Sequence, residues 1–294
     1  MKSTLLWLKL AAIAIGSFSG IANLKVTHAN TALRLDNIAP REVEIHVPPP
    51  ETERKGICTK YTQNVIDRIV ERPSLKGSKW AILIQTIGGD TIYSRNPDSY
   101  MIPASNLKLL VTAAALQKLN PQGKIRSSSI ENWIITTNLR SNNNYADVLL
   151  RFLGGYPSVR NTLSNIGVDP KGYRMRDGSG LSRNNLSTPR TLVTTLRAMH
   201  TARGKDIFLA SLPIAGETGT LKNRLRYTSA QGTVRAKTGT LRGVRALSGY
   251  VETSNYGTLA FSAIANQPTS HSDANLVKAL DEIALRLSML SSCR

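Results

Sequence analysis

The chain has 294 residues, and its 38 Lys and Arg against 19 Asp and Glu give a formal net charge of +19. Aromatic residues make up only 5% of it and do not alternate with the basic ones, which excludes the stacking surface of a single-strand nucleic-acid binder. We therefore expect no nucleic acid among its partners. The charge indicates either an anionic cell envelope or merely a soluble basic surface.

The first 29 residues have the composition of a secretory signal peptide. Lys2 and Lys9 precede an apolar run over residues 10–21, and Thr27 and Ala29 give a small-x-small cleavage pattern. The run is too short to span a bilayer comfortably, so an uncleaved anchor is the less favoured alternative. The sequence predicts an exported protein, either periplasmic or associated with the cell wall.

Residues 30–56 are polar, contain a run of three prolines and show no apolar periodicity, which is typical of a linker. Residues 57–294 remain, enough for one two-lobed domain. Cys58 and Cys293 lie at the two ends of this domain. In an oxidising compartment such a pair is expected to form a disulfide, and two unpaired thiols are the alternative.

The predicted elements alternate in type along the domain. Apolar spacing predicts amphipathic helices over 61–71 and 273–291, and a glycine turn joins two strands over 79–96 into a hairpin. Three more strands are expected over 233–240, 245–253 and 257–267, and helices over 105–119, 145–152 and 189–201. The fold class is therefore α+β: an antiparallel sheet covered by the N- and C-terminal helices, plus a mostly helical lobe.

A serine and a lysine three residues apart open the predicted helix 105–119. Ser105 is expected as its N-cap or in its first turn, and Lys108 projects from the same face one turn on. A serine hydroxyl needs a base to become a nucleophile, and a lysine is that base only if burial or a cationic neighbour lowers its pKa. The apolar residues around Lys108 favour burial, although a capping serine followed by a solvated lysine gives the same spacing.

Two further short motifs follow in order. Ser141 and Asn143 form an SxN pattern, and Lys237, Thr238, Gly239 and Thr240 read KTGT. A helix cap alone explains the first, and a strand edge with a glycine bulge explains the second. The order SxxK, SxN, KTG, however, matches the three motifs of the serine enzymes that recognise penicillin.

Histidine and metal chemistry find little support in the predicted domain. It contains only His200 and His271, and neither is next to a motif serine. A Ser-His-Asp triad is poorly supported, and without a close cysteine pair a zinc site is weaker still. We expect no metal and no cofactor.

Longer stretches extend the resemblance to one family. The runs DGSGLSR (177–183), SLPIAGETGTLKNRL (211–225) and VRAKTGTL (234–241) resemble the class C low-molecular-mass penicillin-binding proteins, the D-alanyl-D-alanine carboxypeptidase/endopeptidase family, over roughly residues 79–267. The resemblance implies a β-lactamase/DD-peptidase-like fold, with residues 57–294 as the catalytic domain. It further implies a serine DD-peptidase that acts on peptidoglycan stem peptides, releases terminal D-Ala through an acyl-enzyme and takes β-lactam antibiotics as covalent inhibitors; cleavage of cross-links is a further expectation.

The resemblance assigns the roles as follows. Ser105 attacks the carbonyl and Lys108 accepts its proton; Ser141 relays a proton to the departing amine, and Asn143 binds the substrate amide. Lys237 helps to keep Lys108 neutral and attracts the substrate carboxylate. The hydroxyls of Thr238 and Thr240 bind that carboxylate, and the backbone N–H groups of Ser105 and Thr240 form the oxyanion hole, worth on the order of 3 kcal/mol per donor.

Some residues and alternatives remain open at this stage. Many relatives carry extra domains between SxxK and SxN, whereas Ser105 and Ser141 are only 36 residues apart here, so substrate and partner selection is open. A β-lactamase is the alternative enzyme, but Glu131 and Glu217, the glutamates between Lys108 and Lys237, lack the context of its water-activating glutamate. The other alternative is an inert peptidoglycan-binding module. We expect Ser179 to be a loop residue lining the cleft and Asp147 a supporting residue; the oligomeric state is not predicted.

Overall fold

The computed structural model describes residues 57–269 and 271–292. The predicted signal peptide, the predicted linker and Cys293 lie outside these residues. The centre of the fold is a five-stranded sheet in which every neighbouring pair is antiparallel. Its strand order is β3 (Thr91–Arg95), β2 (Lys79–Thr86), β10 (Gly257–Asn266), β9 (Val244–Thr253) and β8 (Val234–Leu241).

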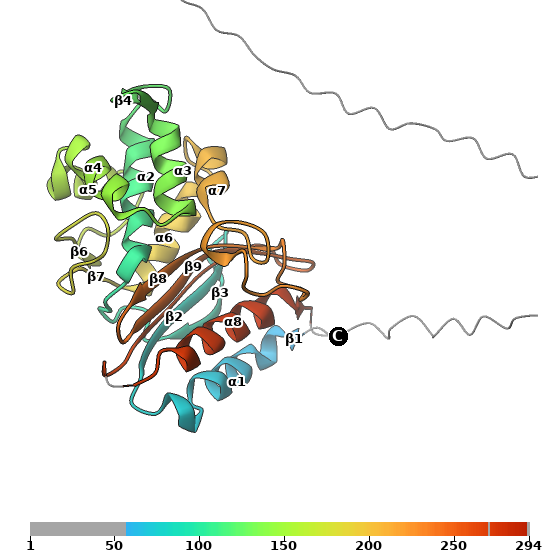
Figure 1. The fold of residues 1–294 in the computed structure, drawn as a ribbon. Coiled ribbons are helices and arrows are strands. Elements are labelled where there is room, and N and C mark those ends of the chain that lie inside the picture. The colour runs from blue at the N-terminus through green and yellow to red at the C-terminus, as the bar shows by residue number, and fades with distance from the viewer. Residues whose placement is uncertain (1–56, 270, 293–294) are drawn as a thin grey trace, which may run out of the picture. The chain divides into compact units, whose positions relative to one another are not determined.

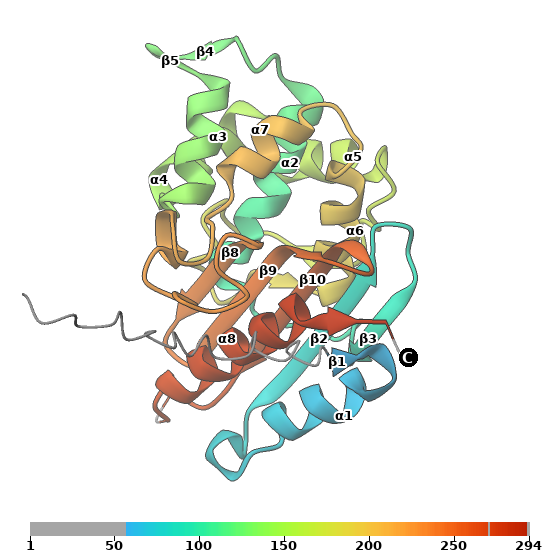
Figure 2. The ribbon, with the colours of Figure 1, turned by 90° about the vertical axis from the view of Figure 1, so that its right-hand side faces the viewer.

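Two helices from opposite ends of the domain cover one face of this sheet. Helix α1 (Thr59–Val70) and helix α8 (Ala274–Ser288) lie side by side there (Figures 1 and 2). Their apolar stripes are buried against the sheet, including Ile66 and Ile69 of α1 and Leu280 and Ile283 of α8. The predicted terminal helices and their shared sheet face are therefore confirmed.

The prediction of a helix over the whole of 273–291 was wrong at its end. Helix α8 stops at Ser288, and Leu290–Ser291 forms β11, which pairs in parallel with β1 (Ile57–Cys58). The pairing keeps Leu290 buried without continuing the helix. It also places Cys58 opposite Ser291, two residues before Cys293 along the chain.

A helical lobe covers the other face of the sheet (Figure 1). At its centre α2 (Lys108–Lys118) is buried at nine consecutive positions, which explains its run of small and apolar residues. The surrounding helices are α3 (Ile130–Leu139), α4 (Asn143–Phe152), α5 (Gly155–Ser164), α6 (Pro189–Met199) and α7 (Lys205–Ser211). The sequence predicted α2, α4 and α6 but missed the other three.

Short elements connect the helices of the lobe to one another and to the sheet. They are η2 (Ala104–Leu107), η3 (Gly219–Leu221), the hairpin of β4 (Lys124–Ile125) and β5 (Ser128–Ser129), and the hairpin of β6 (Tyr173–Arg174) and β7 (Leu186–Ser187). One further short turn, η1 (Pro73–Leu75), lies between α1 and β2 and contacts α8. The 3₁₀ turn η2 packs against the edge strand β8, and this contact forms the floor of the site described next. None of the helices formed by the described residues has the length and apolar character that a membrane crossing requires.

Candidate active site

Ser105 lies in a tight turn between the sheet and the central helix. It is the second residue of η2, which runs directly into α2, so the prediction of a first-turn position is confirmed, whereas its side chain caps nothing. The preceding residue, Ala104, is buried with φ of +48°, an uncommon conformation for a residue with a side chain. The 3₁₀ turn leaves the Ser105 hydroxyl partly exposed above the first residue of α2.

Lys108 is completely buried and turned toward Ser105. Its Nζ atom donates to the Ser105 Oγ atom at 2.7 Å, to the Asn143 Oδ1 atom at 2.8 Å and to the carbonyl oxygen of Ser179. Burial lowers the pKa of Lys108 to about 8, although the carboxylates of Asp147 and Asp177 act in the opposite direction. The alternative of a solvated helix lysine is thus wrong.

The SxN motif lies between α3 and α4. Ser141 adopts φ of +53°, which turns the chain sharply out of α3. The side chain of Asn142 then caps α4 by accepting from the Tyr145 N–H at 3.0 Å, and Asn143, the first helical residue, contacts Lys108. The stretch is both a helix cap and part of the site.

The KTGT motif occupies the edge strand β8, beside η2. Gly239 is needed for close approach and not for a bulge, since a Cβ atom there would lie 2.6 Å from the Pro103 carbonyl oxygen and the register with β9 is continuous. Lys237 is completely buried, and its Nζ atom donates to the Thr238 carbonyl oxygen at 2.9 Å. Burial, and then the neighbouring Lys108, lower the pKa of Lys237 well below its ordinary value.

Burial is the main cause of the lowered pKa of Lys108. Repulsion between the two amines also lowers the pKa of Lys237, and because such repulsion is mutual, it supports the expectation that Lys237 helps to keep Lys108 neutral, which stays a prediction. Protonation of both amines at the same time is unfavourable, because the two lie in one buried region.

The backbone of β8 presents polar groups to the site. The Ala236 N–H donates to the Pro213 carbonyl, and the Val234 carbonyl accepts from the Ala215 N–H, so the backbone polar groups of Ala236 and Val234 point away from β9. Because the direction of these groups alternates from one residue to the next along a strand, the backbone groups of Thr238 and Thr240 also point away from β9. They lie beyond this pairing with the 213–215 segment, and both line a cavity.

This cavity, of about 360 Å³, brings the motifs together. Five predicted site residues line it, namely Ser105, Ser141, Asn143, Thr238 and Thr240. Lys108, Lys237 and Gly239 are not among its lining residues; the two lysines are fully buried. Leu181 also lines the cavity, in agreement with the prediction that its loop lines the cleft. Thr220 and Arg224 line it too and were missed, although the run 211–225 quoted for the family resemblance contains both.

The DGSGLSR loop is fastened beneath Ser105 by two carboxylates. Asp147 accepts the N–H groups of Gly178 at 2.8 Å and Ser179 at 3.0 Å. Asp177 accepts the N–H of Gly180 at 2.6 Å and the hydroxyl of Ser179 at 2.9 Å. The Ser179 hydroxyl is therefore occupied within the loop, and its carbonyl contacts Lys108, in line with the expected loop role.

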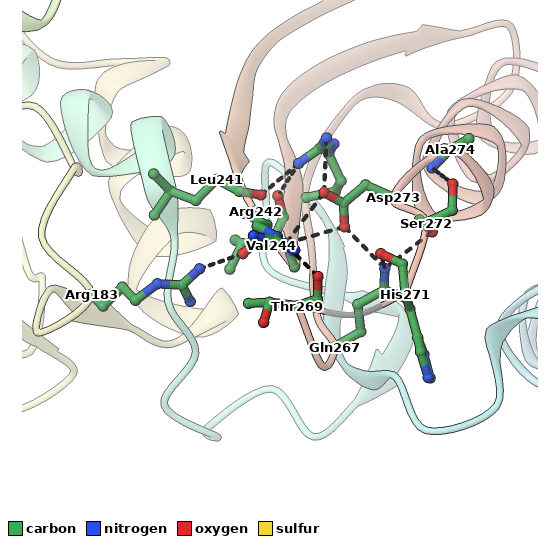
Figure 3. Close-up of polar contacts among 12 residues, drawn as sticks. Arg183, Leu241, Arg242, Val244, Gln267, Thr269, His271, Ser272, Asp273 and Ala274 are labelled. Atoms are coloured by element: carbon green, nitrogen blue, oxygen red, sulfur yellow. Dashed lines mark hydrogen bonds and ion pairs between the residues drawn. The ribbon is translucent and has the colours of Figure 1, made fainter.

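The turn after KTGT is anchored from both sides. Arg183, from the DGSGLSR loop, donates to the Arg242 carbonyl oxygen (Figure 3). Asp273, just before α8, accepts the Gly243 N–H at 3.2 Å and forms an ion pair with Arg245 at 3.1 Å (Figure 3). These contacts fix the end of β8 that carries Thr240.

Neither histidine contributes to this cavity. His200 packs beside Tyr250 with ring centroids 5.9 Å apart, and His271 is exposed. Within residues 57–269 and 271–292, no group of three His, Cys, Asp or Glu side chains is arranged to hold a metal ion.

Solved structures with the same arrangement of sheet and helical lobe define the class of fold. Penicillin binding protein 4 from Haemophilus influenzae superimposes with a TM-score of 0.65 at 15% identity, over 76% of this chain and 99% of that chain. The TLA-3 extended-spectrum β-lactamase gives 0.64 at 21% identity, over 78% and 98%. The fold is that of DD-peptidases and class A β-lactamases, as the sequence predicted.

The chain belongs to the D-Ala-D-Ala carboxypeptidase 3 (S13) family, whose profile matches residues 62–132 and 123–287. A D-alanyl-D-alanine carboxypeptidase of Actinomadura sp. (strain R39) is 43% identical over 164 residues, 50% of this chain and 30% of the relative. A penicillin-sensitive carboxypeptidase A of Dictyostelium discoideum is 32% identical over 188 residues, 56% and 35%. The matched region is thus about a third of the length of these curated relatives.

Proposed function

We propose that the protein is a serine DD-peptidase that acylates itself at Ser105 on the penultimate D-Ala of a peptidoglycan stem peptide. The observation that carries this proposal is the buried Lys108 amine, 2.7 Å from the Ser105 hydroxyl. A neutral amine has two N–H donors and one lone pair. The Asn143 and Ser179 oxygens are available to accept the two N–H groups, which leaves the lone pair for the Ser105 proton.

In the proposed acylation step, the Ser105 Oγ atom bonds to the substrate carbonyl carbon while its proton passes to Lys108. The negative charge on the carbonyl oxygen is held by the Ser105 and Thr240 N–H groups, and the outward direction of the Thr240 backbone supports this assignment. Collapse of the intermediate breaks the peptide bond, and the amine leaves with a proton relayed from Lys108 through Ser141. Water then hydrolyses the ester and frees Ser105.

The substrate would lie along the free edge of β8. The Thr238 and Thr240 hydroxyls line the cavity and are placed to bind the terminal carboxylate, near the buried Lys237. Asn143 offers its amide nitrogen to the substrate backbone, since its oxygen contacts Lys108. β-Lactams present a carbonyl and a carboxylate in a similar relation, and we therefore expect them to acylate Ser105.

A class A β-lactamase is the second candidate, because solved enzymes of that class share the fold. Such an enzyme needs a glutamate that activates the deacylating water. Within the described residues, Glu131 lies in the first turn of α3 and Glu217 is exposed, and neither lines the cavity with Ser105. This favours slow deacylation and hence the peptidase.

The test is D-Ala release from a stem pentapeptide, together with the lifetime of the penicillin adduct. A DD-peptidase releases D-Ala and keeps the adduct for a long time, whereas rapid drug turnover without D-Ala release would indicate a β-lactamase. Neither activity would support the inert binding module. Incubation with cross-linked muropeptide dimers tests whether the enzyme is also an endopeptidase.

A further inference from the structure

The candidate active-site cavity has a wall that the three motifs do not supply. Thr220 of η3 and Arg224, three residues after the end of this turn, line it. Gly219 lets the turn approach the end of α3 closely, because a Cβ atom there would lie 2.5 Å from the Leu139 carbonyl oxygen, at φ of +56°. Ser141 follows Leu139 by two residues and lines the same cavity. This wall therefore lies beside the SxN motif.

Two hydroxyl groups join this wall to the KTGT strand. The Thr238 Oγ1 atom donates to the Thr220 Oγ1 atom at 2.8 Å. A threonine hydroxyl has one proton, so the proton of Thr238 is used within this pair. The proton of Thr220 has no acceptor among the described residues. The pair therefore offers one O–H donor to a ligand in the cavity.

Arg224 brings a positive charge to the same wall. Its Nε and Nη2 atoms donate to the Asp281 carboxylate of α8, at 3.0 Å and 2.6 Å, and the two side chains are 21% and 24% exposed. The Nη1 atom forms no hydrogen bond with any described residue. One edge of the guanidinium is thus fixed by Asp281, which leaves the Nη1 group free to donate to a ligand in the cavity that Arg224 lines.

Lys237 is less suited than Arg224 to hold a permanent charge here. It is completely buried and does not line the cavity, and its amine donates to the carbonyl oxygen of the next residue. Burial and the neighbouring Lys108 lower its pKa, so its charge depends on pH and on the state of Lys108. A guanidinium stays protonated throughout. Among the described residues that line the cavity, Arg224 alone is charged and none is acidic.

We propose that Arg224 and Thr220 bind the carboxylate of the leaving group, so that the site requires a departing amine with a free carboxylate on the adjacent carbon. The Arg224 Nη1 group and the Thr220 hydroxyl are donors without partners among the described residues, and a carboxylate has lone pairs for both. A terminal D-alanine meets the requirement, because its carboxylate remains free in the stem peptide. Asp281 is a positioning residue that holds the guanidinium at the wall.

The inference rests on the proposed function and adds a rule for its substrates. A cross-link to a diamino acid is accepted where the carbon that bears the linked amine also carries a free carboxylate. A cross-link through a side-chain amine without an adjacent carboxylate is not accepted, because it offers Arg224 nothing to bind.

A pair of substrates tests the inference on the full chain. One is a stem pentapeptide that ends in D-Ala-D-Ala, and the other is the same peptide with its terminal carboxylate converted to an amide. The measurement is the ratio of their kcat/KM values, in which any loss of folded enzyme cancels. We expect the wild type to favour the free acid and Arg224→Gln to lower the ratio about tenfold.

The matched control is Arg226→Gln. It removes the same charge from an exposed position two residues further on, which does not line the cavity, and should leave the ratio as in the wild type. A wild type that does not favour the free acid, an unchanged ratio in Arg224→Gln, or an equal fall in Arg226→Gln would overturn the inference.

The pH dependence of the same ratio distinguishes Arg224 from Lys237. With Arg224 as the cation, the ratio in the wild type should stay constant from pH 6 to 9, because a guanidinium does not titrate there and Lys108 affects both substrates alike. A ratio that falls as the pH rises would assign the charge to Lys237 and contradict the inference. Failure of the wild type to release D-Ala from the free acid and to react with penicillin would instead contradict the proposed function on which it rests.

Discussion

The Nζ atom of Lys108 lies 2.7 Å from the Oγ atom of Ser105, in a side chain with no solvent exposure. The amine is held there by two further acceptors, one from α4 and one from the DGSGLSR loop. Three segments that are distant in sequence therefore determine the direction of one lone pair. This convergence, more than the SxxK spacing, suits Lys108 to its proposed role as general base.

The acylation rate is expected to depend on pH through Lys108. Burial lowers the pKa of this amine to about 8, and only its neutral form accepts the Ser105 proton. The rate constant for penicillin acylation should therefore rise about tenfold per pH unit below pH 8 and level off above it. Stopped-flow acylation between pH 6 and 10 measures this; a rate independent of pH over that range would contradict it.

Asp147 is expected to position the loop and to tune Lys108. Asp147→Asn keeps an oxygen for the Gly178 and Ser179 N–H groups but removes a charge that raises the pKa of Lys108. The midpoint of the acylation pH profile should move down by about 0.5–1 unit. Asp147→Ala also leaves the two N–H groups without this partner and should cost about 2 kcal/mol of stability. Identical pH profiles for wild type and Asp147→Asn would contradict the predicted effect of the Asp147 charge on the pKa of Lys108.

Gly180 is expected to be irreplaceable because the loop presses against the turn that carries Ser105. A Cβ atom at this position would lie 2.0 Å from the Ala104 carbonyl oxygen, at φ of +84°. Gly180→Ala should therefore destabilise the protein by about 3 kcal/mol or more. Gly167→Ala is the matched control, with φ of +82° and no atom within 4 Å, and should cost about 1 kcal/mol. Equal losses of unfolding free energy for Gly180→Ala and Gly167→Ala, measured by urea denaturation, would contradict this prediction.

The predicted disulfide between Cys58 and Cys293 is testable by mass. The β1–β11 pairing supports it, because Cys58 lies opposite Ser291. Alkylation should add no mass before reduction and two labels after it, and reduction should lower the free energy of unfolding by about 2–4 kcal/mol. Two labels without reduction would contradict the pairing.

The sequence predicted the sheet and the terminal helices well, because their apolar spacing reflects a buried face. It missed α3, α5 and α7, where burial is shared among neighbouring helices and no clear stripe appears. It extended the last helix through Leu290, since a buried leucine fits a helix stripe and a paired strand equally well.

The motif residues were predictable, but their physical setting was not. Nothing in the SxxK spacing indicates that the Ser179 carbonyl would receive the Lys108 amine, because that contact joins residues 71 positions apart. Leu181, Thr220 and Arg224 reach the cavity from loops whose paths depend on tertiary contacts. The stacking of Trp133 on Tyr145 could not be predicted either, since the two rings come together only when α3 packs on α4.

The most direct test of the central claim is the intact mass of the protein after incubation with benzylpenicillin, followed over time for wild type and Ser105→Ala. We predict a long-lived increase equal to the mass of the drug in the wild type and none in the variant, which should otherwise remain folded. An adduct that persists in Ser105→Ala, or a wild type that never gains mass, would contradict the assignment of Ser105 as the nucleophile.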